Sequence, residues 1–183
     1  LEHKRKQDEI VVLLDITKPN SKLVEEYLRS HCVNGAFNWI KNNFKGHFAE
    51  WKNRLTSHCQ GDYIFQIDAD EIPHEYLIQA LPEIIEMNKE VFLVPRVNTG
   101  SRLTHEFISK WRWNVDEEDR INWPDYQWRI WKNKPEIKWV NKVHERLEGF
   151  KTYAPLGAMV ELSLIHPKTI ERQVKQNDYY ESL

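Results

Sequence analysis

Short apolar runs that alternate with helical segments constrain the fold more than any other feature of this sequence. The run at residues 10–14 is continuous and too short for a free-standing helix, which indicates a strand buried on both faces. Further strands are expected at residues 63–67 and 91–94. This alternation predicts an α/β layer with a mostly parallel central sheet flanked by helices, in which sites gather at the carboxyl ends of strands.

Helices are expected between these strands, where apolar residues recur at spacings of three and four. We place one at about residues 23–28, one from Phe48 to near Gly61, and one that begins at Pro73. Residues 36–39 could form an additional strand.

Beyond Pro95 the sequence predicts an antiparallel or mixed extension of the sheet. Its strand candidates lie at residues 127–131, 142–147 and 160–165, and an amphipathic helix follows Lys168. No internal repeat or linker divides the 183 residues, so we expect a single domain.

The composition excludes several classes of protein. The 26 basic and 28 acidic residues do not produce the positive field of a dedicated nucleic-acid binder. Cys32 and Cys59 lack CxxC spacing, which favours reduced thiols over a zinc cluster or a disulfide framework. No stretch has the length of a membrane span and no signal-like start is present, so we expect a cytoplasmic protein. The first residue is not Met, and a strand follows within nine residues, which suggests a missing upstream segment.

The strongest chemical feature is an apolar strand that ends in Asp68, Asp70 and Glu71. Three carboxylates within four residues indicate a cation. Mg²⁺ and Mn²⁺ bind through one or two carboxylates and leave positions open for substrate phosphates. The alternative is that Asp70 and Glu71 only favour the positive N-terminus of a helix that starts at Pro73.

Glu145 is a candidate general base. In a strand it would share a face with Val143 and Leu147 and be partly buried. Desolvation raises the pKa of a carboxylate toward the range in which it can accept a proton from a hydroxyl. The alternative is a buried glutamate that is paired with a nearby Arg or Lys.

Two further features could contribute to a site. His166 ends an apolar strand, where it could bind a metal or a phosphate, or serve as a hydrogen-bonded structural residue. The aromatic and basic run at residues 123–132 could stack a sugar or a base, although about half of its aromatic residues are expected in the core.

Taken in order, these features resemble the inverting glycosyltransferases of family 2, which have the GT-A fold. The resemblance covers most of the chain. It rests on FAEWKN at residues 48–53, GDY followed by DADE at residues 61–71, QWRIWKN at residues 127–133 and VHE at residues 143–145. Lys52 stands where the family usually has Arg, and the loop after Asp15 departs from the usual sequence.

The resemblance implies a nucleotide-diphosphate sugar as donor and an acceptor that could be a glycan, a lipid, a protein or a modified nucleic acid. Residues 1–97 would form the nucleotide-sugar half and residues 98–183 the acceptor half of a GT-A domain that lacks its first βα unit. A divalent cation, Mn²⁺ or Mg²⁺, would be held chiefly by Asp70, with Asp68 and His166, and Glu145 would be the base. The residues implied to contact the nucleotide-sugar are Asp15, Lys52, Asn53, Asp68 and Arg129.

Two other functions stay open. The same carboxylates would suit a metal-dependent phosphoryl or nucleotidyl transferase, which predicts two cations close together. The changes at Lys52 and after Asp15 would suit a binding module that has lost catalysis.

Overall fold

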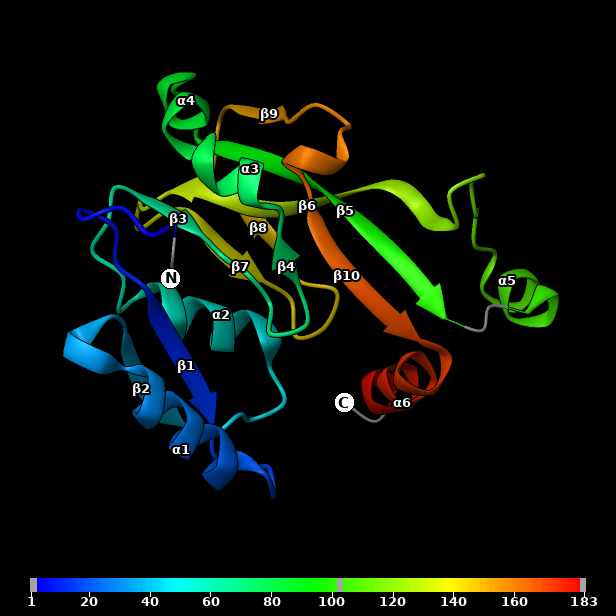
Figure 1. Cartoon of the computed structure of the whole chain (residues 1–183), viewed down its shortest axis with the longest axis horizontal. Coiled ribbons are helices and arrows are strands. Elements are labelled where there is room, and N and C mark those ends of the chain that lie inside the picture. The colour runs from blue at the N-terminus through cyan, green and yellow to red at the C-terminus, as the bar shows by residue number, and fades with distance from the viewer. Residues whose placement is uncertain (1–2, 102–103, 182–183) are drawn as a thin grey trace. The chain divides into compact units, whose positions relative to one another are not determined.

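The computed structural model describes residues 3–101 and 104–181 (Figure 1). The chain forms two compact units. Unit 1 consists of Leu1–Ile64 and Asn133–Gly149, and unit 2 of Phe65–Lys132 and Phe150–Leu183. None of the helices among the described residues combines the length and apolarity that a membrane crossing requires.

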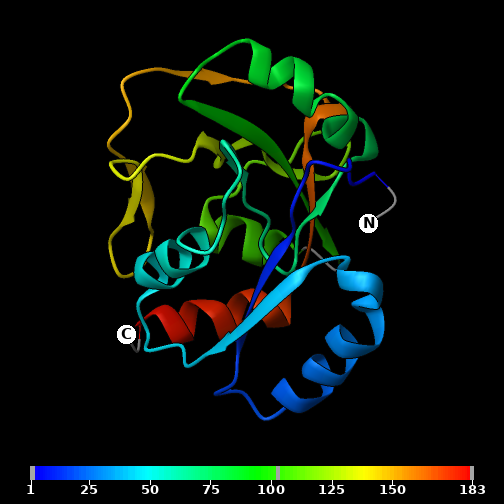
Figure 2. The same ribbon diagram turned by 90° about the vertical axis from the view of Figure 1, so that its left-hand side faces the viewer.

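Unit 1 begins with a β-α-β motif, shown in blue in Figure 2. Strand β1 (Val11–Asp15) pairs in parallel with β2 (Asn38–Asn42), and α1 (Ser21–His31) connects them through the short 3-10 helix η1 (Val33–Gly35). Leu14, Leu28 and Phe37 form the apolar core of this motif. The first strand and helix lie where the sequence predicts them, and the second strand begins two residues later than expected.

The remainder of unit 1 packs α2 (Phe48–Thr56) against a hairpin of β7 (Lys138–Val140) and β8 (Arg146–Glu148). Only the last two residues of the expected strand at residues 142–147 belong to a strand, β8. The chain bends at residues 141–144 instead, and His144 adopts a φ of 52° that is incompatible with an extended strand. Helix α2 also ends at Thr56, several residues before Gly61.

Unit 2 contains most of a curled sheet with the strand order β3-β6-β5-β10-β4, in which β9 also pairs with β5. Figure 1 shows its long strands, β5 (Val91–Ser101), β6 (Arg120–Lys132) and β10 (Leu164–Thr169). The remaining strands are short: β3 (Tyr63–Phe65), β4 (Ile72–Pro73) and β9 (Tyr153–Pro155). The longest pairing, β5 with β6, is antiparallel, as is β10 with β4, whereas β10 and β9 run parallel to β5.

The expected GT-A-like fold, with a mostly parallel central sheet flanked by helices, is therefore wrong. The protein is a mixed α/β structure with a curled, mostly antiparallel sheet and two small additional sheets. Apolar runs indicate burial, but they do not encode the direction of the neighbouring strand. After β5, the excursion that carries α5 (His105–Trp111) returns the chain antiparallel as β6.

Strand β5 continues seven residues past the end expected at residue 94. Proline lacks a backbone N–H and normally interrupts a central strand. Pro95, however, lies between the part of β5 that pairs with β9, which ends at Leu93, and the part that pairs with β10, which begins at Arg96. Neither β9 nor β10 pairs with β5 at Pro95, so no hydrogen bond to those strands is lost and β5 continues through the proline.

Two irregularities interrupt the pairing of β6 with β5. Leu93 pairs with Trp128 and Phe92 with Ile130, so Arg129 has no partner residue in β5. The register shifts a second time between Arg96, which pairs with Asp125, and Asn98, which pairs with Ile121. Bulges re-aim side chains and are frequent next to functional sites. Here they flank the segment of β6 that carries Asp125 and Arg129.

The chain that follows Asp70 enters β4, not a helix. Helix α3 (Glu75–Gln79) begins two residues after Pro73, with His74 as its N-cap, and α4 (Leu81–Glu86) follows. Near the C-terminus, the expected strand at residues 160–165 is replaced by the 3-10 helix η2 (Val160–Leu162) and β10. Helix α6 (Ile170–Glu181) lies close to its predicted position.

Candidate functional site

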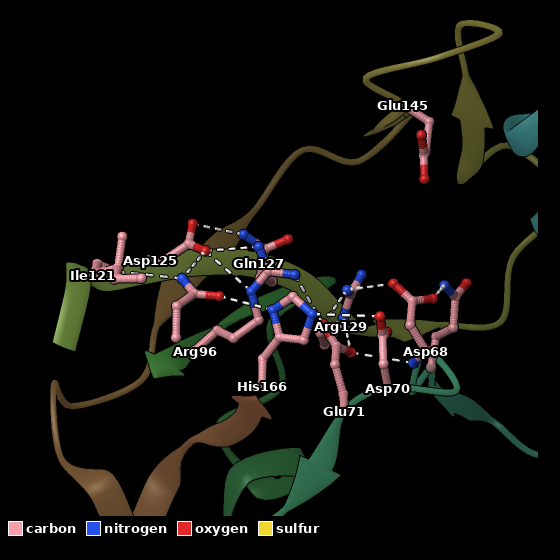
Figure 3. Close-up of polar contacts among 12 residues, drawn as sticks. Asp68, Asp70, Glu71, Arg96, Ile121, Asp125, Gln127, Arg129, Glu145 and His166 are labelled. Carbon is pink, nitrogen blue, oxygen red and sulfur yellow. Dashed lines mark hydrogen bonds and ion pairs between the residues drawn. The ribbon is translucent and has the colours of Figure 1, made fainter. Parts of the chain in front are cut away.

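A buried carboxylate bound by two arginines forms the centre of the site in unit 2 (Figure 3). The side chain of Glu71 is fully buried. Arg129 donates Nε to its Oε2 at 3.0 Å and Nη2 to its Oε1 at 2.6 Å. Arg96 donates Nη1 to Oε1 at 3.0 Å. Two guanidinium groups therefore compensate the charge of Glu71, and its oxygens are committed to them.

Asp68 is also held by Arg129, which donates Nη2 to its Oδ2 at 2.7 Å. Gln66 donates Nε2 to the other carboxylate oxygen at 3.2 Å. Gln66 is itself buried, and its Oε1 has no hydrogen-bond partner among the described residues. The guanidinium groups of Arg129 and Arg96 therefore face three carboxylates, those of Asp68, Glu71 and Asp125.

Asp70 has a different environment from its two neighbours. Its Oδ2 lies 3.4 Å from Nε2 of His166 and 3.4 Å from Nη2 of Arg172, and Figure 3 shows His166 pointing toward it. A hydrogen bond that the doubly protonated ring of His166 donates from Nε2 lowers the pKa of Asp70 to about 2, against the opposing effect of burial. The alternative that Asp70 and Glu71 lie at a helix N-terminus is wrong, because α3 begins only at Glu75.

Asp70 and His166 are spaced suitably to share a divalent cation. Adjacent ligands of an octahedral Mg²⁺ lie roughly 3 Å apart, close to the 3.4 Å between these two atoms. Residues 3–101 and 104–181 contain no group of three or more His, Cys, Asp and Glu side chains that could hold a metal. The pair therefore fits a cation whose other ligands come from water and substrate, not a closed protein site.

A polar network extends from this pair along β5, β6 and β10. Arg96 donates to Oδ2 of Asp125 at 2.7 Å and 3.0 Å, and Asn98 donates to the same oxygen at 2.8 Å. Burial raises the pKa of Asp125, but Arg96 and Asn98 outweigh it, so the pKa is lowered. The pKa of Lys168 is lowered by burial and by Arg96, while Asp125 and Asp70 oppose this shift.

The sequence motifs do not identify Arg96, Asn98, Asp125 and Lys168 as members of this network. A signal is present, because polar residues recur at a spacing of two at residues 96 and 98, 125 and 127, and 166 and 168. The expected strands end before Pro95 and begin again at residue 127. Residues 96, 98 and 125 therefore fall outside them, and the pattern is hidden.

In unit 1, Glu145 forms an ion pair with Lys52, with 2.5 Å between Oε1 and Nζ. Both side chains are mostly buried, and the Lys52 ammonium lies 4.4 Å from the ring centroid of Trp139. Glu145 is partly buried as predicted, but through this ion pair and not through a strand face.

Two other predicted nucleotide-sugar residues in unit 1 are held by the backbone. Asn53 donates to the carbonyl of Trp139 at 2.8 Å and accepts from its N–H at 2.9 Å, which fastens α2 to β7. Asp15, at the end of β1, accepts from the backbone N–H groups of Thr17 and Phe44. Burial raises the pKa of Asp15, but these hydrogen bonds outweigh it.

The aromatic run divides between core and partly exposed positions. Trp131 is almost fully buried, whereas Trp128 packs against Phe150 with 5.2 Å between ring centroids. Trp123 is partly exposed and faces the Arg120 guanidinium at 4.8 Å.

No protein-family model matches this chain, and a search of curated proteins finds no match either.

Replacing Arg129 should reveal the cost of leaving Glu71 only partly compensated. We expect Arg129→Leu to lower the free energy of unfolding by about 3–5 kcal/mol, because breaking a buried ion pair leaves an uncompensated charge. Urea denaturation followed by circular dichroism measures this. Arg172→Leu removes an exposed guanidinium and should change stability by less than about 0.5 kcal/mol. Equal losses in the two variants would contradict this account of Glu71.

The carboxyl group of Asp70 should titrate with a pKa of about 2, below its ordinary value of 3.8. A lowered pKa means that the ionised form stabilises the folded protein above about pH 4, and that this contribution is lost as the pH falls toward 2. Carbon-13 NMR of labelled aspartate should show Asp70 still largely ionised when ordinary carboxyl groups are half protonated. In His166→Leu, the pKa should return toward the ordinary value, and an unchanged pKa would exclude His166 as the cause.

Proposed function

We propose that this protein transfers a sugar from a nucleotide-diphosphate sugar to an acceptor hydroxyl, with inversion at the anomeric carbon. The observation that carries the proposal is the placement of His166 and Arg172 around one carboxylate oxygen of Asp70. The order of the motifs along the sequence supports it.

The diphosphate would be recognised by positive charge around Asp70. Arg172 extends from α6 with 63% of its side chain exposed, so its guanidinium is accessible to a ligand. Lys168 lies near enough to Asp70 for the two charges to interact. Mn²⁺ or Mg²⁺ would be held by Asp70 and His166, and when bound it would offset charge on the leaving diphosphate.

Asp68 and Gln66 would contact the sugar or the ribose, not the metal. Asp68 is 36% exposed and is oriented by Arg129. A buried acceptor without a partner calls for an explanation, and a ligand hydroxyl that donates to Oε1 of Gln66 would provide one.

Glu145 would accept the proton of the acceptor hydroxyl. As the acceptor oxygen bonds to the anomeric carbon, the bond from that carbon to the diphosphate breaks, and the hydroxyl proton passes to the carboxylate. Lys52 holds Oε1 of this carboxylate, and the ring of Trp139 packs against the Lys52 ammonium.

Donor binding should depend on Asp70. With Mn²⁺ present, we expect one or more of the uridine, guanosine, cytidine and thymidine diphosphate sugars to bind, measured by calorimetry. Asp70→Asn should weaken that binding at least about tenfold, the equivalent of one charge-assisted contact. Asp178→Asn removes the same charge from an exposed position on α6 and should bind as the unmodified protein does.

The same calorimetry also distinguishes sugar transfer from phosphoryl transfer. Absence of donor binding in the unmodified protein would contradict the proposal. Two cations bound per chain would favour phosphoryl transfer.

Turnover should depend on Glu145 in a way that donor binding does not. We expect Glu145→Gln to lower the rate of sugar transfer or donor hydrolysis by about 100- to 10,000-fold, because the amide cannot accept the proton. Its donor affinity should stay unchanged. Glu148→Gln, on the same hairpin and about half exposed, is the matched control. Full turnover in Glu145→Gln would remove it as the base, and donor binding without turnover in the unmodified protein would favour an inactive binding module.

A further inference from the structure

We propose that Asn98 is a positioning residue that keeps a proton on Nδ1 of His166, so that Nε2, the nitrogen facing Asp70, is left to bind a cation. Asp125 in turn fixes the orientation of Asn98. This inference rests on the cation site of the proposed function, but the state of the ring can be measured without a metal.

The amide of Asn98 has one favourable orientation. Its Nδ2 lies 2.8 Å from Oδ2 of Asp125 and 3.3 Å from the carbonyl oxygen of Ile121. Both of these atoms are acceptors, so the group that faces them must be the NH₂ donor. A flipped amide would place its oxygen against a carboxylate and a carbonyl. The Oδ1 of Asn98 is therefore directed at His166.

This orientation determines the proton on the imidazole ring. Oδ1 of Asn98 lies 2.8 Å from Nδ1 of His166, and a carbonyl oxygen can only accept, so Nδ1 must donate. A neutral imidazole carries one N–H, and Nε2 is then unprotonated. Metal-binding histidines are commonly held in this way, by a second group that binds the other ring nitrogen.

Sheet register and burial make the arrangement rigid. Asn98 and His166 are direct partners in the parallel pairing of β5 with β10. Asn98 is 2% exposed and His166 is 9% exposed, so water has little access to either side chain. Arg96 holds Asp125 by two hydrogen bonds, and Arg96 also binds Glu71. Figure 3 shows Asp125, Arg96, His166 and Asp70 in this network.

The test uses protein labelled with nitrogen-15 in histidine, without metal, at about pH 8.5, well above the ordinary histidine pKa of about 6.5. Long-range proton–nitrogen NMR distinguishes the two tautomers, and His166→Gln assigns the signals. We expect the Nδ1–H tautomer in the unmodified protein. In Asn98→Leu we expect the Nε2–H tautomer, because the acceptor at Nδ1 is gone while Asp70 still faces Nε2. Affinity for Mn²⁺, measured by electron paramagnetic resonance, should fall about 10- to 100-fold.

Gln127→Leu is the matched control. Gln127 also donates to Asp125, at 2.8 Å, but to Oδ1, whereas Asn98 donates to Oδ2, so this variant should retain the tautomer and the Mn²⁺ affinity. An Nε2–H tautomer of His166 in the unmodified protein would overturn the proposal even if Asn98→Leu did not fold. An unchanged tautomer in folded Asn98→Leu would do the same. If the tautomer changes as expected but the unmodified protein binds no Mn²⁺, the role of Asn98 in orienting the ring stands and the proposed cation site fails.

Discussion

The structure of unit 2 depends on the compensation of one buried charge. Moving a carboxylate out of water is costly unless it is paired and hydrogen-bonded. Glu71 meets this requirement through Arg129 and Arg96, which come from the neighbouring strands β6 and β5. The planar guanidinium of Arg129 binds both oxygens of Glu71. The turn that carries the acidic motif is thereby fastened to the sheet.

The same interaction separates the roles of three adjacent acidic residues. Glu71 is buried and paired with arginines of the sheet. Asp68 shares one of these, Arg129, with Glu71. Asp70 instead contacts His166 from β10 and Arg172 from α6. Of the three, only Asp70 combines partial exposure with a neighbouring imidazole. Asp70 is therefore the residue of the motif best placed to bind a ligand. The number of carboxylates in the sequence does not show this.

The sequence pattern located several elements correctly and misjudged others for identifiable reasons. The apolar run at β5 reflects burial, which depends mostly on local composition, whereas only Leu14 of β1 and Leu28 of α1 are buried. The direction of β6, the passage of β5 through Pro95 and the bend before Glu145 depend on which distant segment lies alongside. A single sequence does not carry that information in any local window.

By itself, the sequence determined which residues are available for chemistry and approximately where the buried strands lie. It identified Asp68, Asp70 and His166 as candidates from their places at the ends of apolar runs, and Glu145 from the partly buried face of an expected strand. Only the tertiary structure decided which of these charges are already compensated. Arg129 lies 58 residues from Glu71, and His166 lies 68 residues from Asn98. Electrostatic pairing acts through distance in space, and the register of β5 with β6 and β10 sets those distances.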